Sequence, residues 1–286
     1  DREAVLAAFV CEQLAMHRKQ FSNCATTRPL VVGLQGPQGS GTQYLYPVTN
    51  VGKSYACAAV AAALAAADPP LRVAVLSLDG VRNRKDDTHA DLYLPHAALV
   101  QVAAEHADNP LLQGRGQPGT HDVPLGTRLL RAFHTLNEIP GASLTLPVYD
   151  KSAFDGYGDR KAEGAVVQAP IDVILFEGWC LGYRSLPDAE IARRIDSAPP
   201  EAACHAYPRA SLYAINAELR VWERAWYPWM DAFVQFYPAV QGTYALVYHW
   251  RLDAEHKMKA SNGGHGMSDE QVRAFVQRCV ATASRN

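Results

Sequence analysis

The residues from 29 to 54 constrain the fold of this 286-residue chain more than any others. Residues 29–35 form a short apolar run, which predicts a buried strand, and Gly36 begins a glycine-rich stretch directly after it. Lys53 and Ser54 then open an alanine-rich segment of good helix formers. A buried strand, a glycine-rich loop and a helix in this order are typical of a phosphate-binding site in an α/β fold.

The glycine-rich stretch and the start of the helix match the two halves of one phosphate-binding motif. Joined directly, they read Gly-Pro-Gln-Gly-Ser-Gly-Lys-Ser, which fits the pattern G-x-x-x-x-G-K-[ST]. In such a loop the backbone N–H groups surround the phosphates, the lysine reaches the β- and γ-phosphates, and the serine hydroxyl holds Mg²⁺. The motif therefore predicts ATP and Mg²⁺ as cofactors. The predicted nucleotide-binding residues are Gly36, Gly39, Ser40, Gly41, Gly52, Lys53 and Ser54, with Ser54 also a metal ligand.

Eleven residues separate the two halves of the motif, namely residues 42–52 or equivalently 41–51. A second segment of eleven residues, 80–90, also interrupts a motif. Its removal joins Ser-Leu-Asp to Asp-Leu-Tyr at the end of the next predicted strand. Both segments are polar or turn-like, and the residues at their boundaries can be encoded with GT and AG splice signals in one reading phase. We hypothesise that both are introns translated in frame, and therefore non-native insertions; the alternative is two genuine loops. Continuous coverage of both segments in the mature transcript would contradict the hypothesis.

Apolar runs and helix-forming stretches alternate along the chain. Strands are predicted at residues 29–35, 71–78, 171–176, 232–236 and 244–248, and helices at residues 54–67, 94–107, 125–136, 210–226 and 269–281. This alternation predicts one P-loop domain over residues 1–286, of the three-layer α/β/α class with a mostly parallel sheet.

Composition excludes several classes of protein. Hydrophobic residues make up 48% of the chain and charged residues 20%, close to globular averages, which argues against disorder and collagen. The net charge of -2 argues against a nucleic-acid partner, and no basic stripe is present. The longest apolar run, residues 56–67, is too short for a bilayer, which needs about 20 apolar residues. The six cysteines are scattered without a Cys-x-x-Cys pair, so we expect a reduced, cytoplasmic protein with no membrane partner.

Longer motifs resemble the D-glycerate 3-kinase family, which includes the plant enzyme and its fungal ATP-dependent kinase relatives. Besides the two phosphate-loop halves, they are residues 109–122 (NPLLQGRGQPGTHD), 149–160 (YDKSAFDGYGDR), 176–179 (FEGW) and 250–256 (WRLDAEH). The resemblance extends from about Phe21 to Val276, and the two inserted segments are the departures from it. The wider class is the P-loop kinases related to phosphoribulokinase, uridine kinase and pantothenate kinase. The resemblance implies an ATP-dependent kinase acting on a small-molecule hydroxyl substrate, most closely D-glycerate.

Acidic residues after two predicted strands are the candidates for proton transfer and metal binding. Asp79 ends the second strand, where doubly wound sheets bind ligands, and the resemblance implies that it accepts the proton of the substrate hydroxyl. Asp91 is the second candidate, because it becomes the neighbour of Asp79 when residues 80–90 are removed; the alternative for both is a helix N-cap. Lys53 completes the catalytic set by neutralising charge on the transferred phosphoryl group. Glu177 is predicted to hold Mg²⁺, the alternative being a solvated charge at a strand end.

The middle motifs supply the predicted substrate-binding residues. Arg115 has the cation and geometry to clamp a small carboxylate or a phosphate. Asp122 is either a ligand of substrate hydroxyls or the N-cap of the following helix, and the two roles are compatible. The remaining assignments in the 149–160 motif follow from the resemblance. The full predicted set is Arg115, His121, Asp122, Tyr149, Lys151 and Arg160.

The sequence thus predicts an ATP- and Mg²⁺-dependent kinase with D-glycerate as its acceptor. Two alternatives stay open. The inserted segments interrupt the phosphate loop, so the chain is alternatively a catalytically impaired nucleotide-binding protein. A related kinase with another hydroxyl acceptor is the other alternative.

Overall fold

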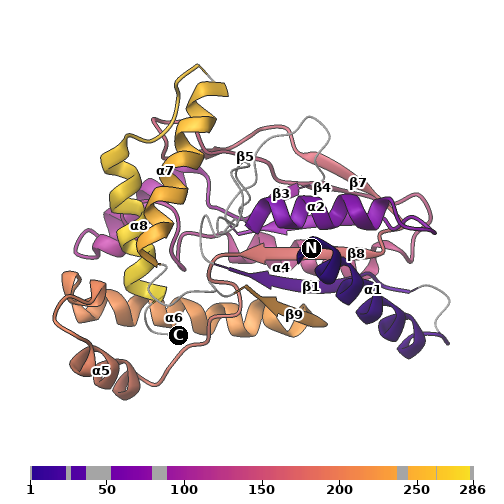
Figure 1. Cartoon of the computed structure of the whole chain (residues 1–286), viewed down its shortest axis with the longest axis horizontal. Coiled ribbons are helices and arrows are strands. Elements are labelled where there is room, and N and C mark those ends of the chain that lie inside the picture. Colours follow the sequence, from indigo (N-terminus) through magenta and orange to yellow (C-terminus); the bar gives the residue numbers. More distant parts are fainter. Residues whose placement is uncertain are drawn as a thin grey trace.

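The computed structural model of the chain describes residues 2–23, 27–36, 53–78, 89–236, 244–261 and 263–283 (Figure 1). Its helices are α1 (Arg2–Gln20), α2 (Lys53–Ala65), α3 (His96–Glu105), α4 (Val123–Leu136), α5 (Asp188–Ser197), α6 (Arg209–Ala225), α7 (Tyr244–Ser261) and α8 (Asp269–Ala283). Its strands are β1 (Leu30–Gln35), β2 (Val73–Ser77), β3 (His89–Asp91), β4 (Ser143–Leu146), β5 (Tyr149–Asp150), β6 (Asp159–Arg160), β7 (Ala165–Gln168), β8 (Val173–Gly178) and β9 (Ala232–Gln235).

Five strands form one parallel sheet in the order β3-β2-β8-β1-β9. The central strand is β8, whose Val173 lies opposite Leu30 of β1 on one side and opposite Val73 of β2 on the other. All five strands run in the same direction, so their carboxyl ends meet along one edge of the sheet, which we call the carboxyl edge. The parallel sheet predicted from the buried apolar runs is therefore confirmed.

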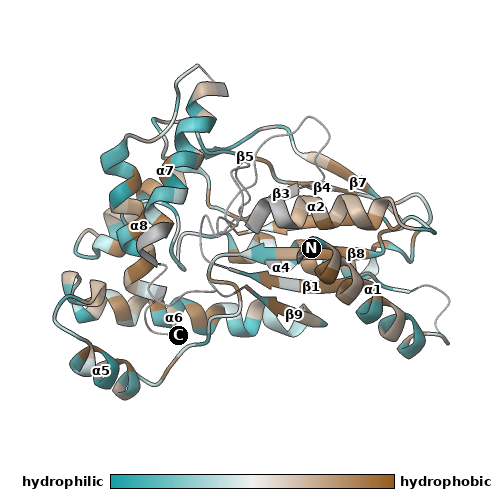
Figure 2. Cartoon of the chain, viewed as in Figure 1, coloured by the Kyte–Doolittle hydropathy of each residue, from teal (hydrophilic) through white to brown (hydrophobic). Residues whose placement is uncertain are grey.

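Helices cover both faces of this sheet and make the fold three-layered (Figure 1). Val32 of β1 belongs to the apolar cluster shared with α1 and α2. Its neighbour Val31 belongs to the other face and to the cluster that contains side chains of α4 and α6. In Figure 2, α2 is mostly hydrophobic in colour, whereas α7 and α8 carry long hydrophilic stretches. Residues of β1 alternate between two apolar layers because both faces are covered.

Two tryptophans at the carboxyl end of α6 lie in the core. Trp222 and Trp226 are fully buried, with ring centroids 4.9 Å apart. Both belong to the apolar cluster that also contains side chains of α4 and β8, so they are packing residues. No helix among the described residues is both long and apolar enough to cross a bilayer.

One predicted strand is wrong, because residues 244–248 form the first part of α7. The segment Tyr-Ala-Leu-Val-Tyr is short, apolar and aromatic, and such a run suits a buried strand and a buried helix equally well. The deciding contact is tertiary: Val247 packs in the cluster that includes Val272 and Phe275 of α8. Pairing with α8 therefore selects the helix.

The two inserted segments fall largely outside the described residues. Only the end of the second one is described, where Ala90 lies buried in β3. The next residue, Asp91, pairs with Ser77 of β2, and paired strands are about 4.8 Å apart. The described residues Ser77 and Asp91, which stand on either side of this segment in the sequence, are therefore neighbours in the sheet.

Candidate active site

Three polar residues stand in a row across neighbouring strands at the carboxyl edge. Ser77 of β2 lies opposite Glu177 of β8 and, on its other side, opposite Asp91 of β3. All three are buried, and the Ser77 hydroxyl donates a hydrogen bond to Glu177 Oε1 at 2.5 Å. Glu177 has an exposed fraction of 0%, so the alternative of a solvated strand-end charge is wrong. Carboxylate and hydroxyl oxygens are the hard ligands that Mg²⁺ prefers, so the residues present fit that ion.

Of the predicted phosphate loop, the structure describes only the residues at its two ends. Gly36 directly follows β1, and α2 begins at Lys53, as the motif requires. The side chains of Lys53 and Ser54 are not among those described. Five further predicted residues also lie outside the described part of the chain: Gly39, Ser40, Gly41, Gly52 and Asp79.

His121 holds the end of β2 in place. Its Nε2 lies 2.9 Å from the carbonyl oxygen of Leu78, and because a carbonyl only accepts, Nε2 carries the proton. The ring stacks on Tyr93, with centroids 4.7 Å apart, and meets Trp222 edge-on at 5.0 Å. Burial lowers the pKa of His121 to about 3, so the ring is neutral at physiological pH. The described contacts of this predicted substrate ligand are thus with two aromatic rings and with the backbone next to Asp79.

Asp122 caps α4, as one of its two predicted roles requires. Its Oδ1 accepts a hydrogen bond of 2.9 Å from the backbone N–H of Leu125. Its Oδ2 accepts from Nη2 of Arg160 at 3.1 Å, and the same Nη2 donates to the carbonyl of Tyr93 at 2.8 Å. Arg160 therefore joins the 149–160 motif to the loop that carries His121. Whether either residue also contacts substrate stays a prediction.

The short pair β5–β6 carries the rest of the predicted substrate set. Tyr149 lies opposite Arg160 in this antiparallel pair. The backbone N–H of Tyr149 donates to Oδ2 of Asp91 at 3.2 Å, which ties the pair to the row of polar residues at the carboxyl edge. Lys151 follows β5 in a turn and is half-buried. Substrate binding by Tyr149 and Lys151 stays a prediction.

The loop that contains Arg115 is anchored to the same edge. Trp179, which follows β8, donates from Nε1 to the carbonyl of Gly116 at 2.8 Å. The carbonyl of Trp179 accepts in turn from Nε2 of Gln35, the last residue of β1, at 2.8 Å. Residues 115–122 are therefore held against the ends of β1, β2 and β8. Sequence reasoning missed Ser77 and Trp179 as parts of the site, although both lie in motifs that it had singled out.

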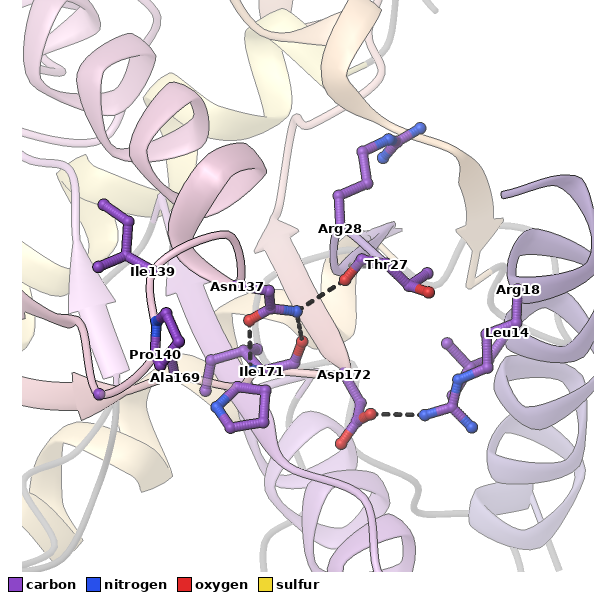
Figure 3. A pocket seen from close by; sticks show the side chains of 12 residues that line it. Leu14, Arg18, Thr27, Arg28, Asn137, Ile139, Pro140, Ala169, Ile171 and Asp172 are labelled. Atoms are coloured by element: carbon purple, nitrogen blue, oxygen red, sulfur yellow. Dashed lines mark hydrogen bonds and ion pairs between the residues drawn. The ribbon is translucent and has the colours of Figure 1, made fainter. Parts of the chain in front are cut away.

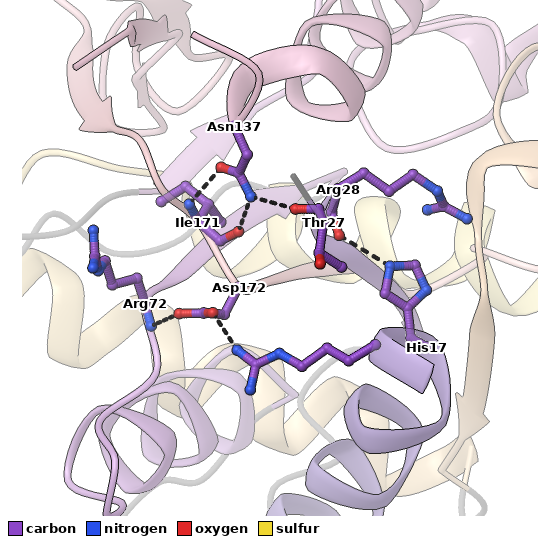
Figure 4. Close-up of polar contacts among 8 residues, drawn as sticks. His17, Thr27, Arg28, Arg72, Asn137, Ile171 and Asp172 are labelled. Atoms are coloured by element: carbon purple, nitrogen blue, oxygen red, sulfur yellow. Dashed lines mark hydrogen bonds and ion pairs between the residues drawn. The ribbon is translucent and has the colours of Figure 1, made fainter. Parts of the chain in front are cut away.

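A cavity of about 440 Å³ lies at the opposite, amino edge of the sheet (Figure 3). Asn137 donates from Nδ2 to the carbonyls of Thr27 and Ile171, both at 2.8 Å, and its Oδ1 accepts from the Ile171 N–H (Figure 4). Arg18 pairs with Asp172 at 2.5 Å. These contacts join α1 and α4 to the segments that enter β1 and β8. The paired polar groups support a structural role for this region.

No family model matches the chain. Individual proteins and solved structures that are similar to it are kinases, in agreement with the arrangement of the candidate active site. The chain is 32% identical to "D-glycerate 3-kinase, chloroplastic" of Arabidopsis thaliana over 94% of its own length and 50% of that protein's. It is 34% identical to "Uncharacterized kinase mug58" of Schizosaccharomyces pombe, over 87% of this chain and 78% of that protein. The solved structure of a D-glycerate 3-kinase from Cryptococcus neoformans matches it with a TM-score of 0.81 and 38% identity, over 100% of this chain and 88% of that one.

The chain belongs to the D-glycerate 3-kinase family. The family assignment from the motifs is therefore confirmed, and so is the α/β class of P-loop kinases. The chain spans half the length of the Arabidopsis relative.

Proposed function

We propose that this chain is an ATP- and Mg²⁺-dependent kinase that transfers the γ-phosphoryl group of ATP to a hydroxyl of D-glycerate. The observation that carries the proposal is the buried row of Glu177, Ser77 and Asp91 at the carboxyl edge. This row lies beside the strand that leads into the phosphate-loop motif. The relatives support the reaction class and the acceptor, because two of them are D-glycerate 3-kinases and the third is a kinase.

Each residue in this proposal has a separate task. Lys53 and the loop amides bind the phosphates, and Ser54 and Glu177 hold the metal ion. When bound, Mg²⁺ neutralises charge on the phosphate oxygens. Asp79 accepts the proton of the attacking hydroxyl, with Asp91 as the second candidate. His121 orients the peptide that precedes Asp79 by holding the Leu78 carbonyl.

A turnover assay on two forms of the protein tests the proposal. One form is the full chain and the other lacks residues 42–52 and 80–90, and each is supplied with ATP, Mg²⁺ and a panel of glycerate, glycerol, sugars and nucleosides. We expect the shortened form to release ADP with D-glycerate, and Lys53→Ala to reduce its rate at least about 100-fold. Binding of ATP by both forms without turnover of any hydroxyl compound would refute the proposal.

A catalytically impaired nucleotide-binding protein is the second candidate, because residues 42–52 interrupt the phosphate-loop motif in the sequence. Titration calorimetry with ATP separates the two candidates. If the full chain is catalytically impaired, we expect it to bind ATP weakly, and we expect the form with both deletions to bind ATP at least about tenfold more tightly. Equal affinity and equal turnover of the two forms would show the inserted segments to be harmless and would exclude it.

A further inference from the structure

Arg115 is a buried cation without an anionic partner among the described residues. Its exposed fraction is 5%. Among the described residues it makes one hydrogen bond, in which Nη1 donates to the carbonyl of Gly156. A guanidinium has five N–H donors, so most of them have no acceptor in the described part of the chain. A buried charge is costly unless an opposite charge and hydrogen bonds compensate it. This arrangement is expected where an anionic ligand completes the site.

The nearby acidic residue is already engaged. Glu255 of α7 is buried, pairs with Arg251 at 2.6 Å and accepts a hydrogen bond of 2.7 Å from the backbone N–H of Met267. Arg251 also acts electrostatically on Arg115 and disfavours its charge, whereas Glu255 favours it. The three charged groups leave one positive charge in excess. Burial is the main reason that the pKa of Arg115 lies below its usual value.

Tyr149 supplies a second donor beside this cation. Its exposed fraction is 2%, and its hydroxyl has no hydrogen-bond partner among the described residues. Burial raises the pKa of Tyr149 to about 12, so the hydroxyl keeps its proton and remains a donor. An unpartnered hydroxyl at this depth is costly, and a ligand oxygen would satisfy it.

Gly158 brings the two donors together. A Cβ on this residue would stand 2.8 Å from Arg115 Nη1 and 3.0 Å from the Tyr149 hydroxyl oxygen, and only 2.4 Å from the Tyr149 ring. The residue also has a φ of +84°, which favours glycine. Both donors therefore flank one backbone position and lie within reach of a single carboxylate.

We propose that Arg115 and Tyr149 form the subsite that binds the carboxylate of the kinase's hydroxyacid acceptor. This inference rests on the proposed function. The subsite is joined to the candidate active site through the hydrogen bond from the Tyr149 N–H to Asp91. A site built to hydrogen-bond a substrate group rejects analogues that lack the group, because its buried donors are then left unpaired. The enzyme therefore selects alcohols that carry a carboxylate over neutral alcohols.

Titration calorimetry without ATP tests the subsite independently of turnover. The probes are D-glycerate, glycerol and inorganic phosphate, and the proteins are the full chain, Arg115→Gln, Arg115→Lys, Tyr149→Phe and the control Tyr157→Phe. Tyr157 is 50% exposed in the same motif. We expect the full chain and the control to bind D-glycerate but not glycerol. Each Arg115 and Tyr149 variant should bind glycerate about 10- to 100-fold more weakly, the effect of losing a hydrogen bond to a charged group.

Three results would overturn the subsite: unchanged glycerate affinity in Tyr149→Phe and Arg115→Lys, equal binding of glycerol, or inorganic phosphate binding more tightly than glycerate. The last result would assign the donors to nucleotide phosphates instead. Companion kinetics separate this inference from the proposed function. Glycerate binding that depends on both residues, without turnover, contradicts the function but supports the subsite. Turnover with an unchanged KM for glycerate in the variants contradicts the subsite but supports the function.

Discussion

Lowering the pH from 7.5 to 5 should destabilise this protein by about 2 kcal/mol through His121 alone. The ring has an exposed fraction of 4%, and burial lowers its pKa to about 3. The carbonyls of Leu78 and Gln117 oppose this shift without cancelling it. In an unfolded chain a histidine titrates near about 6.5. The two states therefore bind different numbers of protons over a wide range of acid pH.

The sign and size of the effect follow from proton linkage. Between about pH 6.5 and about pH 3 the unfolded chain carries a proton on His121 that the folded chain lacks. The free energy of unfolding therefore falls by about 1.4 kcal/mol for each unit of decreasing pH in this window. The contribution is fully present above about pH 6.5 and is lost as the pH falls towards 3. At pH 5 the expected loss is about 2 kcal/mol.

Urea unfolding at pH 7.5 and pH 5 measures this loss. His121→Phe keeps a ring against Tyr93 and Trp222, and His121→Gln keeps a donor for the Leu78 carbonyl. Neither phenylalanine nor glutamine binds a proton between pH 5 and pH 7.5. Both variants should start less stable at pH 7.5 but lose about 2 kcal/mol less than the full chain on acidification. His205→Gln, at an exposed position, should behave like the full chain. If both His121 variants lose as much stability as the full chain, His121 is not the source of the acid sensitivity.

Three further predictions concern the site and its scaffold. Removing residues 42–52 and 80–90 together should raise the rate of ATP turnover with glycerate at least tenfold while the protein stays folded, as measured by ADP release and circular dichroism. Asp122→Ala should lower the free energy of unfolding by about 1–2 kcal/mol in urea titrations, because it removes the α4 cap and an ion pair; Asp122→Asn should recover the cap. Glu177→Gln should raise the Mg²⁺ concentration for half-maximal turnover about tenfold and leave the KM for glycerate unchanged, and an unchanged Mg²⁺ requirement would remove Glu177 from the metal site.

Local sequence predicted the strands that are buried on both faces and the helix that begins with a capping residue. The strands β1, β2 and β8 are continuous apolar runs because both faces of the sheet are covered, and such runs mark buried parallel strands. The helix α4 was predictable from its cap, since Asp122 precedes Val123 and Pro124. The run at 244–248 has no such marker, and only its packing on α8 decides between strand and helix.

The sequence by itself determined the family, the sheet strands β1, β2, β8 and β9, and the residue types available for phosphoryl transfer. Only the tertiary structure decided how those residues combine. It placed Glu177, Ser77 and Asp91 in one row, since register between strands far apart in the chain depends on how the crossovers pack. It also gave Arg115 its burial beside the Tyr149 hydroxyl, which has no hydrogen-bond partner among the described residues, because that environment is built by segments distant in the chain.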